Sequence, residues 1–450
     1  MNAAGVAFAI LCAAMILFFS RQRAVLGIML AVCYVTQGQQ LDLGLHFTLI
    51  RIALLAGIVR VWYRGELKQL VPNVIDKAVL AYAVANIVIY TTRVGTSEAL
   101  VSAMGCAYDI LLSYFVFRYL ITSSADAAEV LSALAWFIVP LAVLMCWEAT
   151  GARNIFFVFG GVPEYAEVRE GHVRCMGPFR SPITAGSFGA SLALLYLALC
   201  WRGLRRPTAL IGFSASLAIM ATAHSSGPLL AFVGGLVALA CWRLRERMRQ
   251  VRWAIALTIL GLHLVMNAPV WFLIAKVSDL TGGGGYHRAA LIDQFINHFS
   301  SWVLLGTSDT GDWMATQLID GKADITNAFV AAGVTAGIIG FILFVTIFVK
   351  CFQLLGRARQ AAATAADAEA EWVVWALGAT LFAHALNQIS VTYFDQMSAP
   401  WYMLLALVAA VGQPTLQAQP EDHLREASSD HHRLGRIYAA DGNECLFGVG

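Results

Sequence analysis

Long apolar stretches alternate with short polar segments along most of this chain, up to about residue 413. About 20 helical residues cross the hydrocarbon core of a bilayer, so each stretch predicts a transmembrane helix. The pattern gives about thirteen spans (twelve to fourteen): 3–20, 24–40, 46–62, 76–92, 97–121, 127–149, 182–201, 208–225, 227–242, 253–271, 327–349, 372–390 and 397–413. We therefore expect an all-α polytopic membrane domain over 1–413.

Two long polar loops, 150–181 and 272–326, interrupt the apolar pattern, and a polar segment, 414–450, ends it. The first span has no basic residue before it and is followed at once by Arg21 and Arg23, which places its N-terminus outside. With alternating spans, most of the 30 Lys and Arg residues then lie inside and both long loops lie outside. The last segment is predicted to be a disordered cytoplasmic tail.

The composition agrees with a membrane protein: of 450 residues, 59% are hydrophobic and 13% are charged, and the mean hydropathy is +0.69. The net charge of +2 is divided among the loops and does not form one basic surface. We expect membrane lipids among the partners and no nucleic acid. Cys175 is the only cysteine in a predicted outer loop, so no disulfide partner is expected for it.

An amphipathic helix is predicted in the second long loop, after four glycines at 282–285. Its apolar face is made of residues at helical spacing: Leu291, Ile292, Phe295, Ile296 and Phe299. Such a face lies on a membrane surface or in a protein groove.

Arg288 falls in the middle of that apolar face and in the first helical turn. It needs an anionic partner there, and free backbone N–H groups in the first turn also favour phosphate. The partner is either the phosphate of a lipid or an internal carboxylate such as Asp293 or Asp320.

In the first long loop, Arg174 and Arg180 precede Ser181 and Pro182, which form a good N-cap and first residue for the next span. One interpretation is that the arginines snorkel or pair with the neighbouring glutamates. The other is that they clamp a diphosphate, because the guanidinium fork matches phosphate oxygens.

Three further polar residues lie at the same outer level. Arg51 stands inside the third span and either snorkels outward or faces an interior cavity. His224 and Ser226 lie at the boundary after the eighth span, where a structural role and a functional role are both open.

Three motifs together resemble the O-antigen ligase and polymerase group, which includes exopolysaccharide polymerases. The first is Arg174-x-x-Gly177-Pro178-Phe179-Arg180-Ser181-Pro182-x-x-x-Gly186 at the start of a span. The second is Ser225-Ser226-Gly227, where the family usually has Ser-Arg-Gly. The third is the long outer loop with Arg288, then Leu305-Gly306 and Thr326-Asn327. Ser226 and Thr326 depart from the family, because they replace its usual arginine and the histidine that ligases carry.

The resemblance implies a bacterial inner-membrane glycosyltransferase with a GT-C-like helical fold. Such enzymes act at the periplasmic face on undecaprenyl diphosphate-linked oligosaccharides, without a nucleotide sugar, a metal or another cofactor. The expected reaction is polymerisation of the repeat units. Transfer to lipid A core by a ligase, and transport by a lipid-linked glycan flippase, are the alternatives. Chain-length or export proteins are the expected protein partners.

Cleavage of the bond between sugar and diphosphate builds negative charge, which Arg288, Arg174 and Arg180 are expected to stabilise. The acceptor hydroxyl needs an oriented acceptor or base. The candidates are Asp324, Asp320 and His287, and Asn327 either orients the acceptor or caps a helix.

Overall fold

The computed structural model describes residues 1–42, 46–279, 284–314 and 318–412. Its helices are α1 (Ala3–Phe18), α2 (Arg21–Tyr34), α3 (Leu49–Tyr63), α4 (Val74–Val94), α5 (Ser97–Leu120), α6 (Ser124–Phe137), α7 (Val139–Gly151), α8 (Pro182–Trp201), α9 (Arg206–Thr222), α10 (Ser226–Ala240), α11 (Met248–Val265), α12 (Leu273–Asp279), α13 (Gly285–Asn297), α14 (Phe299–Trp302), α15 (Ala328–Thr364), α16 (Ala368–Gln388) and a last helix at 398–412. Three hairpins accompany them: β1–β2 (Gln40–Asp42, His46–Thr48), β3–β4 (Glu167–Arg169, His172–Arg174) and β5–β6 (Leu318–Ile319, Lys322–Ala323).

Each of the thirteen predicted apolar ranges contains helical structure, although several ranges extend beyond the helix: 24–40, for example, is helical only to Tyr34. The range 127–149 falls on two helices, α6 and α7, which join at Ile138 where Pro140 begins the next turn without a backbone donor. The predicted N-cap at Ser181 is confirmed, because its side chain accepts the N–H of Thr184 at the start of α8. The predicted tail, 414–450, lies outside the described residues.

Six helical segments in the described part of the chain are long and apolar enough to cross a membrane: Val74–Val94, Ser97–Leu120, Ser124–Gly151, Pro182–Trp201, Ser226–Val265 and Ala328–Thr364. Several other helices at predicted spans are shorter, such as α1 with 16 residues and α2 with 14. The protein is therefore all-helical, with six segments able to span a membrane. The structure does not show the thirteen predicted membrane crossings.

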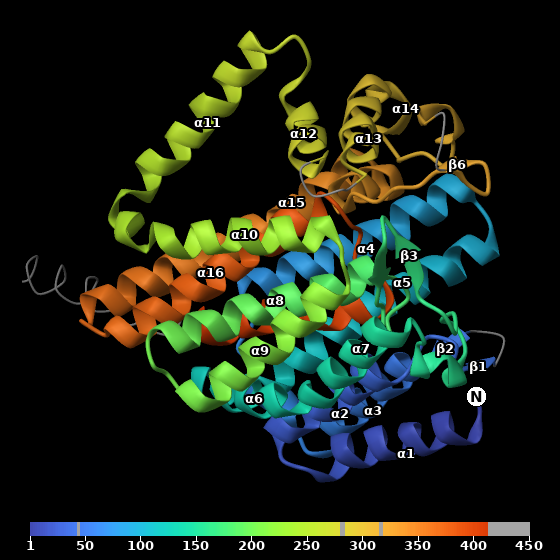
Figure 1. Cartoon of the computed structure of the whole chain (residues 1–450), viewed down its shortest axis with the longest axis vertical. Coiled ribbons are helices and arrows are strands. Elements are labelled where there is room, and N and C mark those ends of the chain that lie inside the picture. Colours follow the sequence, from blue (N-terminus) through green and yellow to red (C-terminus); the bar gives the residue numbers. More distant parts are fainter. Residues whose placement is uncertain (43–45, 280–283, 315–317, 413–450) are drawn as a thin grey trace, which may run out of the picture.

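The centre of the bundle is the helix at 398–412, in which every residue from Trp401 to Ala410 is buried. Around it, α8 packs against α9, α10 and α16, while α15 packs against α4 and α16. The helices α1, α2, α3 and α6 form a layer on the opposite side from α10 and α15 (Figure 1). By contrast, α11 projects from the bundle and buries none of its residues.

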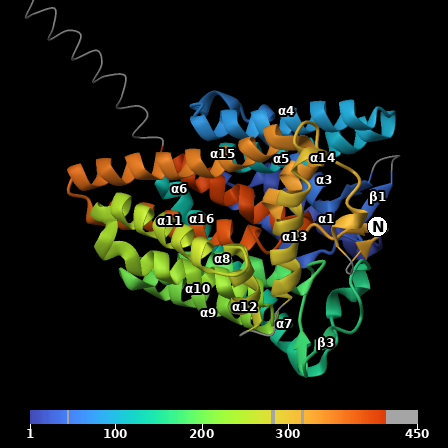
Figure 2. The ribbon, with the colours of Figure 1, turned by 90° about the horizontal axis from the view of Figure 1, so that it is seen from above.

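One end of the bundle carries the irregular structure, as Figures 1 and 2 show. The three hairpins, α13, α14 and the segment 389–397, which connects α16 to the last helix, lie there. We call this surface the loop face. It collects the described parts of both predicted long loops, 150–181 and 272–326, on one side of the molecule.

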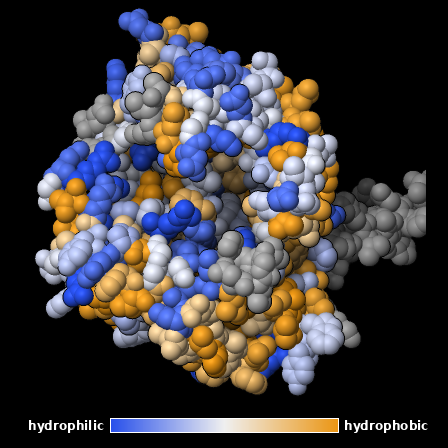
Figure 3. Space-filling model, turned by 90° about the vertical axis from the view of Figure 1, so that its right-hand side faces the viewer, coloured by the Kyte–Doolittle hydropathy of each residue, from blue (hydrophilic) through white to orange (hydrophobic). Residues whose placement is uncertain are grey.

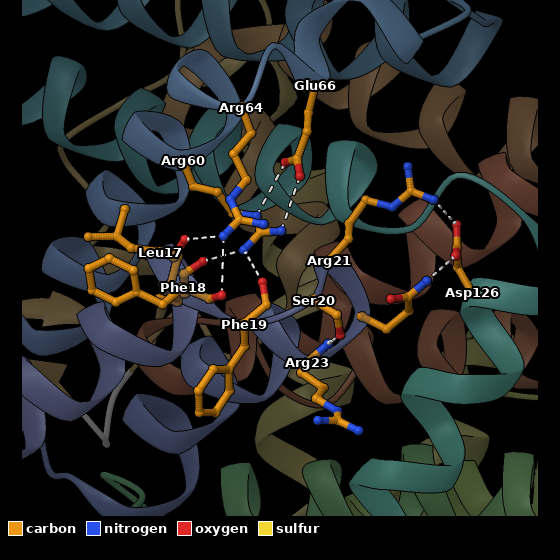
Figure 4. Close-up of polar contacts among 12 residues, drawn as sticks. Leu17, Phe18, Phe19, Ser20, Arg21, Arg23, Arg60, Arg64, Glu66 and Asp126 are labelled. Atoms are coloured by element: carbon orange, nitrogen blue, oxygen red, sulfur yellow. Dashed lines mark hydrogen bonds and ion pairs between the residues drawn. The ribbon is translucent and has the colours of Figure 1, made fainter.

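At the opposite end of the bundle, buried and exposed arginines form hydrogen bonds and an ion pair that stabilise the fold (Figure 4). Arg60 is 1% exposed, donates to the carbonyls of Ile16 and Phe19 at the end of α1, and pairs with Glu66 at 3.1 Å. Arg64 donates to two further carbonyls of the same turn. These contacts satisfy carbonyl groups that have no partner within the helix.

The long helix α15 is kinked at Ala336 and Gly337, where the backbone leaves the helical region. The carbonyl of Val334 instead accepts the backbone N–H of Thr307. Gly337 has φ +62°, and a Cβ there would lie 2.4 Å from the carbonyl oxygen of Leu304. The kink thus depends on a glycine and fixes the loop after α14 against α15.

Candidate functional site

The predicted amphipathic helix is present as α13, and its apolar face packs against protein. Leu291 and Phe295 are buried with Trp302, Trp313 and Val330 in a small hydrophobic cluster. The ring of Phe295 stacks on that of Trp302 at 3.9 Å. These two residues of the predicted face occupy a protein groove and hold α13 at a fixed position on the loop face, whereas Ile296 and Phe299 are 47% and 50% exposed.

Arg288, in the first turn of α13, has no hydrogen bond or ion pair with any described residue. Neither internal carboxylate considered from the sequence pairs with Arg288: Asp293 accepts from Trp271 and Asn297, and Asp320 is exposed in a hairpin turn. Burial, and then the charges of Arg169 and Arg174, lower the pKa of Arg288. The guanidinium therefore lies among like charges in a partly dry environment.

The hairpin β3–β4 supplies these two arginines. Its register pairs Glu167 with Arg174 and Arg169 with His172, and the turn has Glu170 and Gly171 at positive φ. Arg174 pairs with Glu167 at 2.9 Å, while its Nε is buried without a partner. Arg174 thus pairs with a neighbouring glutamate, as one of the two interpretations predicted. Its guanidinium nevertheless keeps one buried N–H group without a hydrogen-bond acceptor among the described residues.

His224 joins this group from the turn between α9 and α10. Its ring stacks on that of His172 with centroids 4.8 Å apart. Burial lowers the pKa of His224, and the charges of His172 and Arg174 lower it further. Both histidines thus lie beside the arginines, and a bound anion would favour the protonated form of His224.

The N-terminus of α10 adjoins the same group. Ser225 is the N-cap but its side chain makes no cap hydrogen bond, and Ser226 is the first helical residue. A Cβ on the buried Gly227 would lie 3.6 Å from Nη2 of Arg288. We call Arg169, His172, Arg174, His224 and Arg288 the arginine–histidine cluster.

The loop that carries Arg174 into α8 is held by buried polar contacts. Glu148 accepts the backbone N–H groups of Met176 and Gly177, and Asn154 donates to the carbonyl of Gly177. Gly177 has φ +55°, which explains a glycine at this place in the motif. The backbone N–H of Cys175 also donates to the carbonyl of Thr222 in α9. The loop therefore positions Arg174 rigidly beside His224.

Arg180 and Arg51, also predicted to bind diphosphate, belong to a second group. Arg180 pairs with Asp395 at 3.4 Å and its guanidinium lies over the ring of Phe394. Arg51 pairs with Asp109 through Nε at 2.7 Å and Nη2 at 2.6 Å. Because each arginine has a carboxylate, this group is balanced in charge. In the arginine–histidine cluster Arg174 pairs with Glu167 and Arg169 lies 4.0 Å from Glu170, so the unbalanced charge there is that of Arg288.

The candidate bases are spread over the rest of the loop face. Asp320, with φ +50°, is exposed in the turn of β5–β6. His287 is buried, with Nε2 3.0 Å from the backbone oxygen of Asp324 and Nδ1 without a partner. No contact of the Asp324 carboxylate is present among the described residues. Asn327 accepts the N–H groups of Phe329 and Val330, so it caps α15.

The segment 389–397 connects these parts, and it was missed as a functional segment because it is a short loop between two spans. Ser390 lies 3.2 Å from the position of a Cβ on Gly227. Thr392 donates to the carbonyl of Ile325, and Gln396 donates to that of Pro178. The sequence did hold one signal: an acidic residue, Asp395, directly after two aromatic residues in a predicted outer loop.

Viewed toward the end that carries these residues, the surface is hollowed near its middle, and hydrophilic side chains surround the hollow (Figure 3). Within the described residues, no group of three or more His, Cys, Asp or Glu side chains is placed to hold a metal ion. No protein-family model matches the chain, and no curated protein matches it. The site is therefore interpreted from its own geometry.

Proposed function

We propose that this protein is a multi-pass membrane glycosyltransferase that uses a polyprenyl diphosphate-linked glycan as donor and binds the diphosphate at the arginine–histidine cluster. The observation that carries the proposal is Arg288, a partly buried guanidinium that has no partner among the described residues and lies beside two further arginines and two histidines. A charged group in such surroundings is stabilised by an anion from outside the protein, and a diphosphate supplies several acceptor oxygens.

The chemistry follows from the leaving group. As the bond between the anomeric carbon and the phosphate oxygen breaks, the electron pair stays with the diphosphate and its negative charge grows. Fixed guanidinium groups, and the free N–H groups at the start of α10, stabilise that charge more strongly in the transition state than in the bound donor. The rigid backbone contacts around Arg174 and α13 keep these groups in place before the donor binds.

The proposal extends to the topology and location. We propose the N-out, C-in arrangement of about thirteen spans in a bacterial inner membrane, with the loop face in the periplasm and the polar C-terminal residues in the cytoplasm. Six segments with sufficient length support multiple crossings, and the arginines of the opposite end support its cytoplasmic side. Joining one repeat unit to another fits this reaction, as does transfer to lipid A core by a ligase.

The decisive experiment uses the full chain in lipid nanodiscs. The donor is the lipid diphosphate-linked oligosaccharide from membranes of the native host, labelled in its diphosphate, and the readout is release of the labelled lipid diphosphate from the glycan. Turnover by the wild type, lost in Arg288→Gln but kept in Arg153→Gln, is expected, since Arg153 is 57% exposed and pairs with Glu164. No release of label in any protein, with movement of the lipid across proteoliposomes, would instead establish a flippase.

A further inference from the structure

Asp395 occupies a fixed position on the loop face. It begins the short 3-10 helix η6 (Asp395–Met397) with φ +49°, a left-handed conformation that aspartate adopts more readily than most residues. Its neighbour Gln396 is 1% exposed and donates to the carbonyl of Pro178 at 2.6 Å. The buried neighbour thus locks the backbone that presents the Asp395 carboxylate beside the Arg174–Gly186 motif.

The carboxylate of Asp395 retains free acceptor capacity. Its one contact among the described residues is Arg180, at 3.4 Å, and that guanidinium is 67% exposed. A structural carboxylate in the same chain looks different: Asp126 accepts from Arg21, Gln22 and the backbone of Ser123. An ionised carboxylate offers about four acceptor positions, so Asp395 leaves most of them for a ligand.

Burial and the charged groups around Asp395 shift the pKa of its carboxyl group. Burial raises its pKa, Arg180 from the loop before α8 lowers it, Asp109 of α5 raises it, and Arg51 of α3 lowers it. A carboxyl group with a raised pKa is a stronger base when ionised than an ordinary surface carboxylate.

The surroundings suit a neutral sugar. Phe394 is 37% exposed beside Asp395, and the Arg180 guanidinium lies 5.8 Å from its ring centroid. An exposed aromatic ring offers an apolar surface for the C–H groups of a sugar, while the carboxylate and guanidinium accept and donate hydrogen bonds to its hydroxyls. The paired charges give this group no net attraction for a diphosphate, in contrast to the arginine–histidine cluster.

We propose that Asp395, Arg180 and Phe394 form the acceptor-sugar subsite, and that Asp395 is the general base of the transfer. This inference rests on the proposed function. The acceptor hydroxyl gives its proton to the Asp395 carboxylate while its oxygen forms a bond to the anomeric carbon of the donor. The bond from that carbon to the phosphate oxygen breaks, its electron pair leaves with the lipid diphosphate, and Asp395 later releases the proton to water. No oxidant, reductant or metal takes part in this balance.

The geometry of the segment 389–397 supports the two subsites acting together. Ser390 adjoins Gly227, next to Arg288, and Asp395 follows five residues later beside Arg180. Between them, Thr392 is bonded to the carbonyl of Ile325 at 3.0 Å. One anchored stretch of backbone therefore connects the proposed diphosphate position with the proposed base.

The test compares Asp395→Asn with Asp312→Asn, a matched change at an exposed aspartate of the same face. Asparagine keeps the size and the left-handed backbone, so Asp395→Asn is expected to fold. We expect it to lower kcat by about 10²- to 10⁴-fold, the usual contribution of a general base. Binding of undecaprenyl diphosphate should change by less than about twofold, or 0.4 kcal/mol. Asp312→Asn should match the wild type in both measurements.

A pH profile separates catalysis from a structural role. The wild type should lose activity as the pH falls through the pKa of Asp395, and the residual activity of Asp395→Asn should lack this acidic limb. Arg180→Gln removes a charge that lowers that pKa, so its acidic limb should move to higher pH.

Retention of full kcat by Asp395→Asn, an equal loss of diphosphate binding, or an unchanged acidic limb would each overturn the inference while leaving the proposed function intact. A wild type that releases no sugar from the lipid donor would overturn the proposed function, and this inference with it.

Discussion

Replacing Arg288 with alanine should remove activity without harming the fold. No described residue hydrogen-bonds to Arg288 or pairs with it, so its removal leaves no protein group unsatisfied. It also relieves the repulsion from Arg169 and Arg174. We therefore expect the free energy of unfolding to stay within about 0.5 kcal/mol of the wild type. The loss of one preorganised donor to a developing anion typically costs about 3–4 kcal/mol in the transition state, so kcat should fall by about 10²- to 10³-fold.

Arg60→Ala is the matched control, because Arg60 is an arginine that the protein itself satisfies. Its removal leaves the buried Glu66 without its guanidinium partner, and the carbonyls of Ile16 and Phe19 at the end of α1 lose their hydrogen-bond donor. Breaking such a buried pair costs about 3–5 kcal/mol. The yield of monodisperse protein from membranes measures the effect on the fold, and release of the labelled lipid diphosphate measures the effect on activity. A yield of Arg288→Ala as low as that of Arg60→Ala, or turnover equal to the wild type, would refute the reasoning.

Three further predictions follow from single features of the structure. Gly337→Ala should lower the yield of folded protein strongly, because the residue has φ +62° and the new Cβ would lie 2.4 Å from the carbonyl oxygen of Leu304; normal yield and thermal stability would contradict the kink. In a variant without native cysteines, a cysteine at the exposed Ser308 should react with a membrane-impermeant thiol reagent in spheroplasts, and a cysteine at the exposed Thr364 should not. The reverse labelling pattern would invert the proposed topology. Binding of undecaprenyl diphosphate should strengthen as the pH falls from about 8 to about 5.5, because the lowered pKa of His224 rises when an anion binds and His224 then takes up a proton. The variant His224→Gln should show a weaker dependence of binding on pH. An equal dependence in that variant would exclude His224 as its source.

The helices could be predicted from the sequence because many residues contribute to the hydropathy of each range. Each apolar range, including the weakly defined 24–40 and 227–242, contains a helix, and the Ala-rich segment after residue 357 continues as α15 to Thr364. Membrane crossing is a different property. It requires length as well as apolar character, and packing within the bundle buries α2, which with 14 residues is too short to span by itself.

The arginine–histidine cluster was only partly accessible from the sequence. Arg174, Arg288 and His224 were each recognised as polar residues at the outer level, yet their convergence depends on long-range contacts such as that of Cys175 with Thr222. Arg180 was predicted to bind the same diphosphate as Arg174, although the structure pairs it with Asp395. Residues six apart in a bent loop point to different surroundings, and spacing alone does not reveal this.

The contrast among the arginines gives the physical basis for separating structure from chemistry in this fold. Arg60 is 1% exposed and fully engaged, so its charge stabilises the ends of helices. Arg288 is held by the packing of α13 close to the positive charges of Arg169 and Arg174, and it gains no hydrogen bond or ion pair from the part of the chain that the structure describes. Such an arrangement persists only when the hydrophobic packing of Leu291 and Phe295 outweighs it. The guanidinium is therefore preorganised by apolar contacts that do not depend on the ligand, and its binding energy remains available for an anion.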